Sequence, residues 1–423
     1  MNVTALILAA GKGTRMKSDL PKVLHPVAGK PMISHVIDSC IEAGIKDIVL
    51  ICGYKSAEVK KYARQAYKKV KFVIQKPQKG TAHAITAAIK ARVPMKKHIL
   101  ILSGDVPLIS PDTIKGLINE ASKKSVSAVI AVSKVKNPRG YGRVLTSKKR
   151  GILRIIEEKD ASPAQKKIRL INGGVYVIVN HILKKYINKV KINKKKGEYY
   201  LTDIAGLMSE NSLKIKEKQA DYTELSGIND RAQLAEAGKI KNKKVLEKLS
   251  KNGITIGDFD TVFIDSNVQI GKGTVIKPFT VIKGKSKIGK NCIIGPSAHI
   301  RPGTVIGDSC KIGNYVEIKN SRIGSRVNVA HLSYVGDAEI GSRTNIGAGT
   351  ITANYDGVKK HKTRIGVNVK VGSNVVFVAP VRVGSNVTVA AGSVVTDNVP
   401  PGALVIARAR QVVKKNRKKR RRK

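Results

Sequence analysis

The segment KIGKNCIIGPSAHIRPGTVIGDSCKIG, residues 287–313, repeats an aliphatic residue followed by glycine at short intervals. This pair recurs over the second half of the chain, and most of its separations are 6, 12 or 18 residues. A six-residue repeat is typical of a parallel β-helix, whose short strands stack their aliphatic side chains inward. We therefore expect a hexapeptide-repeat left-handed parallel β-helix over residues 252–407. The aliphatic positions are Ile256, Ile270, Ile288, Ile294, Ile306, Ile312, Ile323, Val335, Ile340, Ile346, Ile365, Val371 and Val383.

Separations of 11, 5 and 19 residues interrupt the repeat. The longest spans Asn354-Tyr355-Asp356-Gly357 and a basic stretch, which we expect to leave the coil as a loop. Loops on a regular scaffold are where binding residues tend to lie. The repeat thus predicts a scaffold together with a candidate site on it.

The first 225 or so residues alternate strand-like and helix-like segments instead. This rhythm predicts a doubly wound, Rossmann-like, mainly parallel α/β domain over residues 1–229, with ligands at the carboxyl ends of its strands. A helix beginning near Asn229 or Asp230 is expected to connect the domains over residues 230–251. The expected strands are Val3–Ala10, Asp47–Cys52, Lys71–Ile74 and His98–Leu102, and the expected helices are Pro31–Ala43, Lys55–Tyr67 and Thr81–Val93.

The formal net charge of +51 is the most unusual feature of the composition. Lysine is spread along the whole chain, which favours solvated basic faces over a nucleic-acid protein with one basic patch. Residues 408–423 form a basic tail that we expect to be disordered and able to contact nucleic acid non-specifically. A basic, trimeric nucleic-acid-binding scaffold therefore stays open as an alternative function.

The four cysteines include no Cys-x-x-Cys pair, so a zinc site is not expected. Sparse thiols in a long chain fit a reducing compartment. The first apolar run lacks the features of a signal peptide, and no stretch reaches the ~20 apolar residues of a membrane span. We expect a cytoplasmic protein without a membrane span.

A glycine-rich turn, Leu8-Ala9-Ala10-Gly11-Lys12-Gly13-Thr14-Arg15-Met16, follows the first expected strand. Such a turn lets backbone N–H groups approach phosphate oxygens. It fits neither the dinucleotide-binding fingerprint nor the Walker loop, so alone it indicates little.

Further motifs give the turn a context, and with it they resemble the signature of the sugar nucleotidyltransferases. Together with the hexapeptide half, the chain is similar to the bifunctional N-acetylglucosamine-1-phosphate uridyltransferase / glucosamine-1-phosphate N-acetyltransferase family. This resemblance implies a homotrimer that makes UDP-N-acetylglucosamine from UTP, acetyl-CoA and glucosamine 1-phosphate, by way of N-acetylglucosamine 1-phosphate, for cell-wall polymers. The motifs are Pro21-Lys22-Val23-Leu24, Gln75, Gly80-Thr81, Gly104-Asp105-Val106-Pro107-Leu108, Gly140-Tyr141-Gly142-Arg143, Glu157-Glu158-Lys159-Asp160, Asn172 and Gly227-Ile228-Asn229-Asp230-Arg231.

The resemblance also implies roles in the first domain. Asp105 and Asn229 would hold Mg²⁺, a hard ion that prefers oxygen ligands. Arg15 and Lys22 would balance phosphate charge during transfer, which needs positioning and charge stabilisation rather than a covalent nucleophile. The residues implied to bind UTP and UDP-N-acetylglucosamine are Leu8, Ala9, Ala10, Gly11, Arg15, Lys22, Gln75, Gly80, Thr81, Gly104, Gly140, Glu157, Asn172 and Asn229.

In the second domain, acetyl transfer to an amine needs a base, and histidine is the side chain best suited to that role near neutral pH. His331 lies in a polar stretch similar to the family's acetyltransferase site, so it is the candidate base, and Glu317 is a candidate to orient its ring. The resemblance places that site between subunits of the trimer. Arg301, Lys319, Tyr334 and Asn345 would bind glucosamine 1-phosphate, and Ala348, Asn354, Tyr355, Ser373, Ala391 and Arg408 would face acetyl-CoA.

The chain departs from the family in two places. Gly173 stands where relatives usually carry a hydroxyl residue, and the start of the β-helix between Asn252 and Arg301 is shorter by roughly two coils. A nucleotidyltransferase for another sugar 1-phosphate is the nearest alternative. It usually lacks the combination of His331 with Asn354-Tyr355.

Overall fold

The computed structural model describes residues 1–194 and 196–414, and the chain divides into two compact units between Lys241 and Asn242. The end of the expected basic tail, residues 415–423, lies outside the described residues. Within the described ranges, none of the helices combines the length and apolar character that a membrane span requires.

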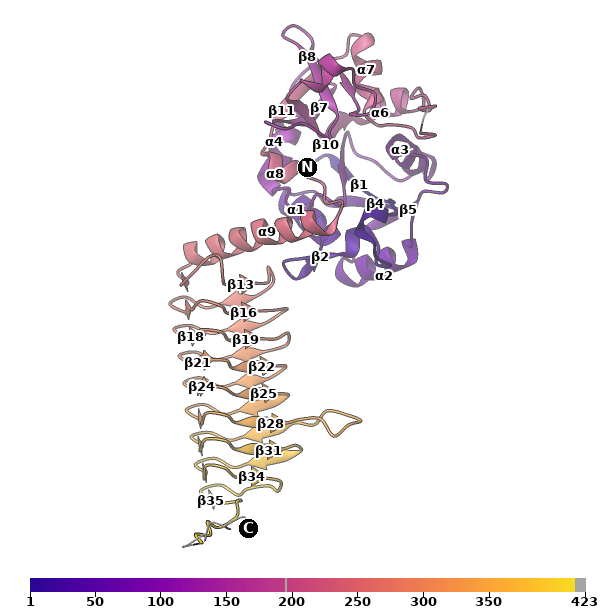
Figure 1. Cartoon of the computed structure of the whole chain (residues 1–423). Coiled ribbons are helices and arrows are strands. Elements are labelled where there is room, and N and C mark those ends of the chain that lie inside the picture. Colours follow the sequence, from indigo (N-terminus) through magenta and orange to yellow (C-terminus); the bar gives the residue numbers. More distant parts are fainter. Residues whose placement is uncertain (195, 415–423) are drawn as a thin grey trace, which may run out of the picture. The chain divides into compact units, whose positions relative to one another are not determined.

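The first unit is built on a nine-stranded sheet (Figure 1). Its strand β1 (Val3–Ala9) is apolar almost throughout and packs on both faces: Ala5 and Ile7 join one core cluster, and Leu6 joins the other. Burial on both faces is the mark of a doubly wound sheet. In spatial order the strands are β5 (Lys71–Ile74), β4 (Asp47–Cys52), β1, β6 (His98–Ser103), β10 (Leu170–Val179), β7 (Ala128–Lys134), β11 (Ile215–Gln219), β9 (Gly151–Ile156) and β8 (Arg143–Ser147).

The sheet is less uniformly parallel than expected. β5, β4, β1 and β6 run parallel, but β10 is antiparallel to both of its neighbours, β6 and β7. The sequence rhythm beyond β6 did not reveal this reversal, because a continuous apolar run has no direction. The parallel half alone brings several strand ends together at one edge.

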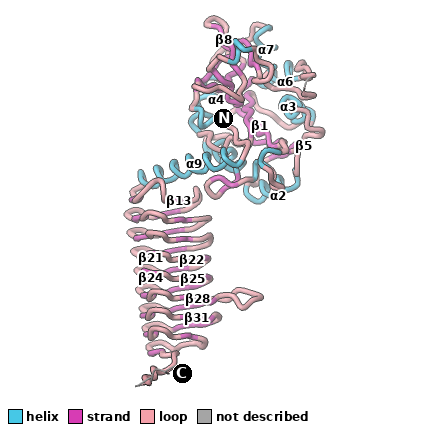
Figure 2. Tube along the Cα trace, viewed as in Figure 1, coloured by secondary structure: helices cyan, strands magenta, loops and turns pink. Residues whose placement is uncertain are grey.

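Helices cover both faces of this sheet (Figure 2). α1, expected to include Pro31, begins one residue later, and Gly44 follows its end with φ of 89°, a conformation that suits glycine. The helices are α1 (Met32–Glu42), α2 (Ser56–Ala66), α3 (Thr81–Lys90), α4 (Pro111–Ala121), α5 (Pro163–Lys166), α6 (Asn180–Ile187), α7 (Asp203–Glu210), α8 (Tyr222–Leu225) and α9 (Arg231–Lys251). Short 3₁₀ turns η1 (Thr14–Met16) and η2 (Lys22–Leu24) and a small hairpin of β2 (Pro26–Val27) and β3 (Lys30–Pro31) complete the unit.

The second unit is a β-helix of three parallel sheets, as the repeat predicts (Figure 1). Strands one coil apart pair in register; Val275 pairs with Ile293, and Ile293 with Lys311. Eleven of the thirteen predicted aliphatic positions are buried, whereas Ile256 and Ile270, near the start of the coil, are partly buried. Stacked aliphatic residues therefore form one continuous core.

The three sheets of the second unit take every third strand. Sheet one is β12 (Thr255–Ile256), β15 (Val275–Ile276), β18 (Ile293–Ile294), β21 (Lys311–Asn314), β24 (Asn328–His331), β27 (Asn345–Ile346), β30 (Lys370–Val371), β33 (Thr388–Val389) and β35 (Leu404–Val405). Sheet two is β13 (Phe263–Ile264), β16 (Val281–Ile282), β19 (His299–Ile300), β22 (Glu317–Lys319), β25 (Tyr334–Gly336), β28 (Ile351–Ala353), β31 (Val376–Val378) and β34 (Val394–Val395). Sheet three is β14 (Gln269–Ile270), β17 (Lys287–Ile288), β20 (Val305–Ile306), β23 (Arg322–Ile323), β26 (Ala338–Ile340), β29 (Thr363–Ile365) and β32 (Val381–Val383).

The predicted loop is present between β28 and β29, and it projects from the coil (Figure 1). Tyr355 and Lys360 pair as an antiparallel bridge, so the loop is a hairpin. We call residues 354–361 the projecting hairpin.

Candidate functional sites

In the first unit, the ends of β1 and β6 lie side by side. Leu8 pairs with Ser103, and the N–H of Gly104 donates to the carbonyl of Leu8 at 2.8 Å. A Cβ on Gly104 would lie 2.7 Å from Cδ1 of Ile33, so only glycine fits there unless Ile33 moves. This packing places the following residue, Asp105, at the carboxyl edge of the sheet, where ligands bind in such folds.

The glycine-rich turn leaves β1 at Ala9 and Ala10, and its backbone is open at one point and crowded at another. A Cβ added to Gly11 would meet no atom within 4 Å, so this backbone is accessible. Gly13 has φ of 65°, and a Cβ there would lie 2.6 Å from Cβ of Lys22. The second glycine therefore lets Lys22 approach the turn.

Four predicted residues meet at this edge. The Lys22 ammonium binds the carboxylate of Asp105 and donates to Oδ1 of Asn229 at 2.9 Å. Nη2 of Arg15 donates to the same Asn229 oxygen at 2.8 Å. The N–H of Ile228 donates to the carbonyl of Asp105 at 2.9 Å, which ties the two segments together. Two cations and two oxygen donors from three distant parts of the sequence thus share one site.

Gln75, Gly80 and Thr81 form a second predicted group. Gln75 is buried, and its amide donates to the carbonyl of Gly80 at 2.9 Å. Gly80 has φ of 96°, and a Cβ there would lie 2.6 Å from the carbonyl oxygen of Tyr199. The hydroxyl of Thr81 accepts the N–H of Leu201 at 2.9 Å. Side chains and backbone together fix the entry to α3.

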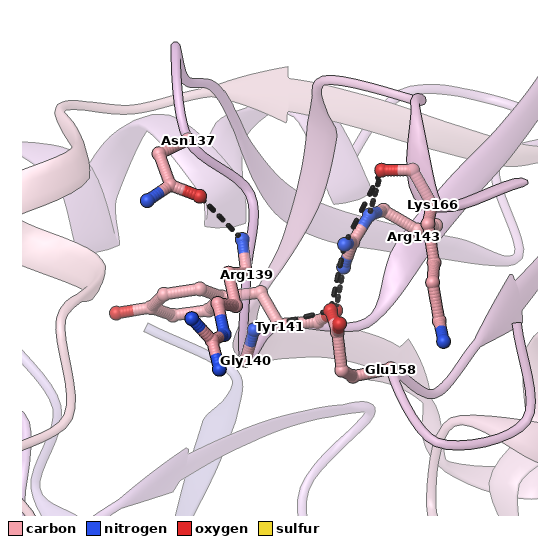
Figure 3. Close-up of polar contacts among 7 residues, drawn as sticks. All are labelled: Asn137, Arg139, Gly140, Tyr141, Arg143, Glu158 and Lys166. Atoms are coloured by element: carbon pink, nitrogen blue, oxygen red, sulfur yellow. Dashed lines mark hydrogen bonds and ion pairs between the residues drawn. The ribbon is translucent and has the colours of Figure 1, made fainter. Parts of the chain in front are cut away.

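The segment around Gly140 is held by residues that the sequence analysis did not assign (Figure 3). The N–H of Gly140 donates to Oε2 of Glu158 at 3.1 Å, and Arg143 binds the same oxygen at 2.6 Å. Arg143 is buried, and it also donates to the carbonyl of Tyr141. The adjacent carboxylates in Glu157-Glu158 were a usable signal, because two neighbouring residues in a strand-like segment point to opposite sides.

Glu157, the predicted sugar-binding residue of that pair, accepts the hydroxyl of Thr202 at 2.9 Å. Burial raises the pKa of its carboxyl group. The Asn172 amide donates to the Tyr176 hydroxyl at 2.8 Å, and its oxygen accepts the N–H of Gly174 at 3.1 Å. Thr202 and Tyr176 are supporting residues that no motif revealed.

The departure at Gly173 has a structural counterpart. A Cβ at this position would lie 2.4 Å from Cδ1 of Leu225 and 2.9 Å from the carbonyl oxygen of Ala131. A hydroxyl-bearing residue therefore does not fit here without movement of β7 or α8.

In the second unit, the Glu317 carboxylate binds Nη1 of Arg301 at 2.7 Å. Glu317 lies on β22 in sheet two, whereas His331 ends β24 in sheet one. Among the described residues, no hydrogen bond joins Glu317 to the His331 ring. The structure therefore makes Glu317 a partner of Arg301, and the expected contact with His331 does not form within this chain.

His331 itself is exposed. Its register is set by Asn314, its neighbour one coil earlier, and its carbonyl accepts the hydroxyl of Ser333 at 2.8 Å. Asn345 is also exposed on sheet one. The ring of His331 is thus free to meet a substrate or another subunit.

Lys319 and Tyr334 lie on β22 and β25 of sheet two, close to Arg301. Lys360 of the projecting hairpin lies beside Lys319, and this neighbouring cation lowers the pKa of Lys319. Arg301 adds to the same effect. Lys360 was not predicted as a site residue, because only the folded hairpin brings it next to Lys319.

Asn354 and Tyr355 separate in the structure. Asn354 is buried, and its amide donates to Oδ2 of Asp337 at 2.5 Å; Asn320 donates to Oδ1 of the same carboxylate at 2.5 Å. Tyr355 is 61% exposed, and its hydroxyl donates to the carbonyl of Gly357 at 2.5 Å. Asn354 therefore anchors the hairpin, and Tyr355 is the member of the pair that is free to face a ligand.

The other predicted acetyl-CoA residues lie further along the coil. The Ala348 carbonyl accepts the N–H of Asn374 at 2.7 Å, and Ser373 is exposed. The Arg408 guanidinium donates to the carbonyl of Ala391, so these two positions meet although a coil separates them.

These two sites define a transferase with one centre per unit, an α/β nucleotidyltransferase followed by a hexapeptide-repeat transferase. The comparisons agree with that class. The nucleotidyl transferase family matches residues 4–222, and the bacterial transferase hexapeptide (six repeats) family matches residues 285–320 and 362–397.

Relatives similar over the whole chain identify the family. The bifunctional protein GlmU of Thermoanaerobacter pseudethanolicus is 43% identical over 97% of this chain and 96% of its own. The bifunctional protein GlmU of Geotalea uraniireducens is 42% identical over 98% of both chains, and that of Picosynechococcus is 42% identical over 97% and 98%. The chain belongs to the GlmU family of bifunctional enzymes.

Proposed function

We propose that the second unit transfers the acetyl group of acetyl-CoA to the amine of glucosamine 1-phosphate. The first unit then joins the resulting N-acetylglucosamine 1-phosphate to UTP, forming UDP-N-acetylglucosamine and pyrophosphate. The observation that carries the proposal is the meeting of Lys22, Asp105 and Asn229, whose contacts span 83 and 207 positions of sequence. Family membership over nearly the whole chain supports both steps.

In uridylyl transfer, a phosphate oxygen of the sugar attacks the α-phosphorus of UTP, and the bond to pyrophosphate breaks. Arg15 and Lys22 offset the negative charge of the phosphates as they come together. Gln75, Gly80 and Thr81 bind the uracil, and the accessible backbone around Gly11 approaches the phosphates. Gly140, Glu157 and Asn172 bind the sugar; a buried, hydrogen-bonded carboxyl group is suited to recognise hydroxyl groups.

The cofactor of this step is Mg²⁺, held by Asp105 and Asn229. Their oxygens already converge on one cation, the Lys22 ammonium, and carboxylate and amide oxygens are ligands that Mg²⁺ accepts. Among the described residues, no group of three or more His, Cys, Asp or Glu side chains gathers as a metal site. Substrate phosphates would therefore complete the coordination, and the bound ion would neutralise phosphate charge.

In acetyl transfer, the amine nitrogen attacks the thioester carbonyl, and the bond to the CoA sulfur breaks. His331 accepts the proton that the amine loses, and its exposed ring is free to reach it. Arg301, Lys319 and Lys360 bind the phosphate, with Tyr334 and Asn345 along the sugar. Tyr355, Ser373, Ala391, Arg408 and the backbone of Ala348 face acetyl-CoA.

The chain assembles as a homotrimer through the β-helix. Along sheet two, Phe263, Ile351 and Val394 point outward and are 46%, 43% and 49% exposed. Along sheet three, the corresponding outward positions Lys287, Arg322, Arg364 and Arg382 are cationic. An apolar column suits burial between subunits, and a cationic column suits solvent.

The reaction takes place in the cytoplasm, where UTP and acetyl-CoA are available, and its product supplies cell-wall synthesis. The test is incubation of the purified protein with glucosamine 1-phosphate, acetyl-CoA, UTP and Mg²⁺, followed by product identification. We expect UDP-N-acetylglucosamine, CoA and pyrophosphate, and no sugar nucleotide when acetyl-CoA is omitted. Equal use of another sugar 1-phosphate would contradict the proposed specificity.

A further inference from the structure

The projecting hairpin is closed at its base and capped at its tip. The N–H of His361 donates to the carbonyl of Asn354 at 2.8 Å, and Tyr355 pairs with Lys360. At the tip, Oδ1 of Asp356 accepts the backbone N–H groups of Val358 and Lys359 at 2.8 and 2.7 Å. The hairpin thus has a defined conformation before any ligand binds.

A side-chain contact joins the two strands of the hairpin. Nε2 of His361 lies 2.6 Å from Oδ2 of Asp356. The backbone N–H of Lys359, followed by His361, holds the pKa of Asp356 well below its usual range. Because an ionised carboxylate only accepts hydrogen bonds, the His361 ring must be the donor. We call this contact the Asp356–His361 latch.

The two ends of the hairpin are anchored to the coil. Asn354 is fixed by the buried Asp337 at 2.5 Å, and Lys362, just beyond the hairpin, binds Oε1 of Glu339 at 3.1 Å. In the described part of the chain, the hydrogen bonds from Tyr355 to Lys359 stay within the hairpin. The conformation of the tip therefore depends on its own contacts.

The position of Lys360 costs free energy in the unliganded protein. Its ammonium lies beside that of Lys319, and like charges at close range repel. Without a restraint, Lys360 would move away until an anion bound between the two cations. The latch supplies a restraint, because it fixes both residues that flank the Tyr355–Lys360 pair.

We propose that the Asp356–His361 latch is a positioning device that holds Lys360 next to Lys319, so that the phosphate of glucosamine 1-phosphate meets a preformed cationic pair. Preorganisation lowers the cost of ordering side chains on binding. The ligand assignment rests on the proposed function of the second unit. The latch itself rests on the hairpin geometry alone.

The first test replaces His361 by Phe, which keeps an aromatic ring but removes the donor. We expect KM for glucosamine 1-phosphate to rise about three- to tenfold, the range for losing one exposed charge-assisted contact. kcat, KM for acetyl-CoA and uridylyl transfer should stay within twofold. His361→Gln, which keeps an N–H donor, should restore KM. Val358→Ala is the matched control on the same hairpin, because Val358 is 89% exposed.

A double-mutant cycle shows whether the latch acts through Lys360. In a Lys360→Ala background, His361→Phe should raise KM no further. An equal rise with and without Lys360, or an equal rise in KM for acetyl-CoA, would overturn the proposal.

The last measurement does not need activity. Amide exchange of Val358 and Lys359, followed without substrates, should be faster in His361→Phe than in the wild type and in His361→Gln. Unchanged exchange would show that the latch is absent. If the wild type failed to acetylate glucosamine 1-phosphate while exchange responded as expected, the proposed function would be wrong and the latch would stand as a restraint on Lys360. Binding of inorganic phosphate, weakened by His361→Phe and restored by His361→Gln, would then identify the anion that the lysine pair meets.

Discussion

The two candidate sites differ in how complete they are within one chain. In the first unit, Lys22 contacts both Asp105 and Asn229, and these contacts are partly buried. In the second unit, His331 and Tyr355 are exposed, and Glu317 contacts Arg301 rather than the base. A site with satisfied internal contacts is ready for substrate, whereas a site of separate, exposed side chains needs a ligand or a neighbouring subunit to complete it.

The largest expected effect sharpens this difference from the side of the second unit. His331→Ala should lower acetyl transfer by about 10²–10⁴-fold, because general-base catalysis typically contributes that much. Uridylyl transfer and trimer content should not change, and the residual rate should rise from pH 6 to 9 as free amine becomes available. The measurement is CoA release per folded trimer across that range.

A structural histidine would behave differently. Its removal would lower the melting temperature and trimer content, and lost activity would follow lost protein. An acetyl-transfer rate within threefold of wild type would show that His331 is not the base.

A second variant breaks the first site alone. Asp105→Ala removes an oxygen donor from the cluster with Lys22 and Asn229, and we expect pyrophosphate release to fall by about 10²–10³-fold. CoA release should stay within twofold of the wild type, because acetyl transfer belongs to the other unit. Both products are measured on the same preparation. Parallel loss of both activities in a folded, trimeric variant would refute the assignment of one site to each unit.

A third variant tests how tightly the first unit is packed around its site. Gly173→Ser adds a Cβ that meets Leu225 and the Ala131 carbonyl, and overpacking of this kind costs about 1–3 kcal/mol. We expect a lower melting temperature for the first unit and an unchanged transition for the β-helix. Calorimetry resolves the two, and Gly140→Ser is a useful comparison, because a Cβ at Gly140 meets nothing within 4 Å. A stabilised Gly173→Ser variant would mean that β7 and α8 yield easily.

The smallest effect concerns the basic tail. Truncation after Gln411 should leave both activities within twofold, because every assigned site residue precedes it. Binding to nucleic acid should weaken and its salt dependence should flatten, since fewer phosphate contacts release fewer counterions. Filter binding at several salt concentrations measures this. Loss of acetyl transfer at saturating acetyl-CoA would place the tail in the site.

The sequence predicted the two units to different depths. The strands Asp47–Cys52 and Lys71–Ile74 are confirmed, because turns and breaks bound both of them. The antiparallel β10 was missed, because an apolar run indicates burial but not direction. In the β-helix, a strict period predicts register directly, so the stacked aliphatic positions followed from the sequence.

The candidate sites show the same limit. Asp105 and Asn229 were proposed together, and the structure brings them to one cation. The Glu317–Arg301 pair and the approach of Lys360 to Lys319 depend on side-chain directions across coils, which no linear motif encodes.

The in-register pairing of the coils also bears on how such chains change over evolutionary time. Strands of one sheet are linked by backbone bonds between equivalent positions 18 residues apart, as Cys292 and Thr274 are. Loss or duplication of one whole coil leaves every remaining partner matched, whereas a smaller deletion shifts each inward residue to the wrong face. Genetic changes in this half are therefore filtered into steps of one coil. Lineages can shorten the stack ahead of Arg301 while the acetyl-transfer residues beyond it keep their neighbours.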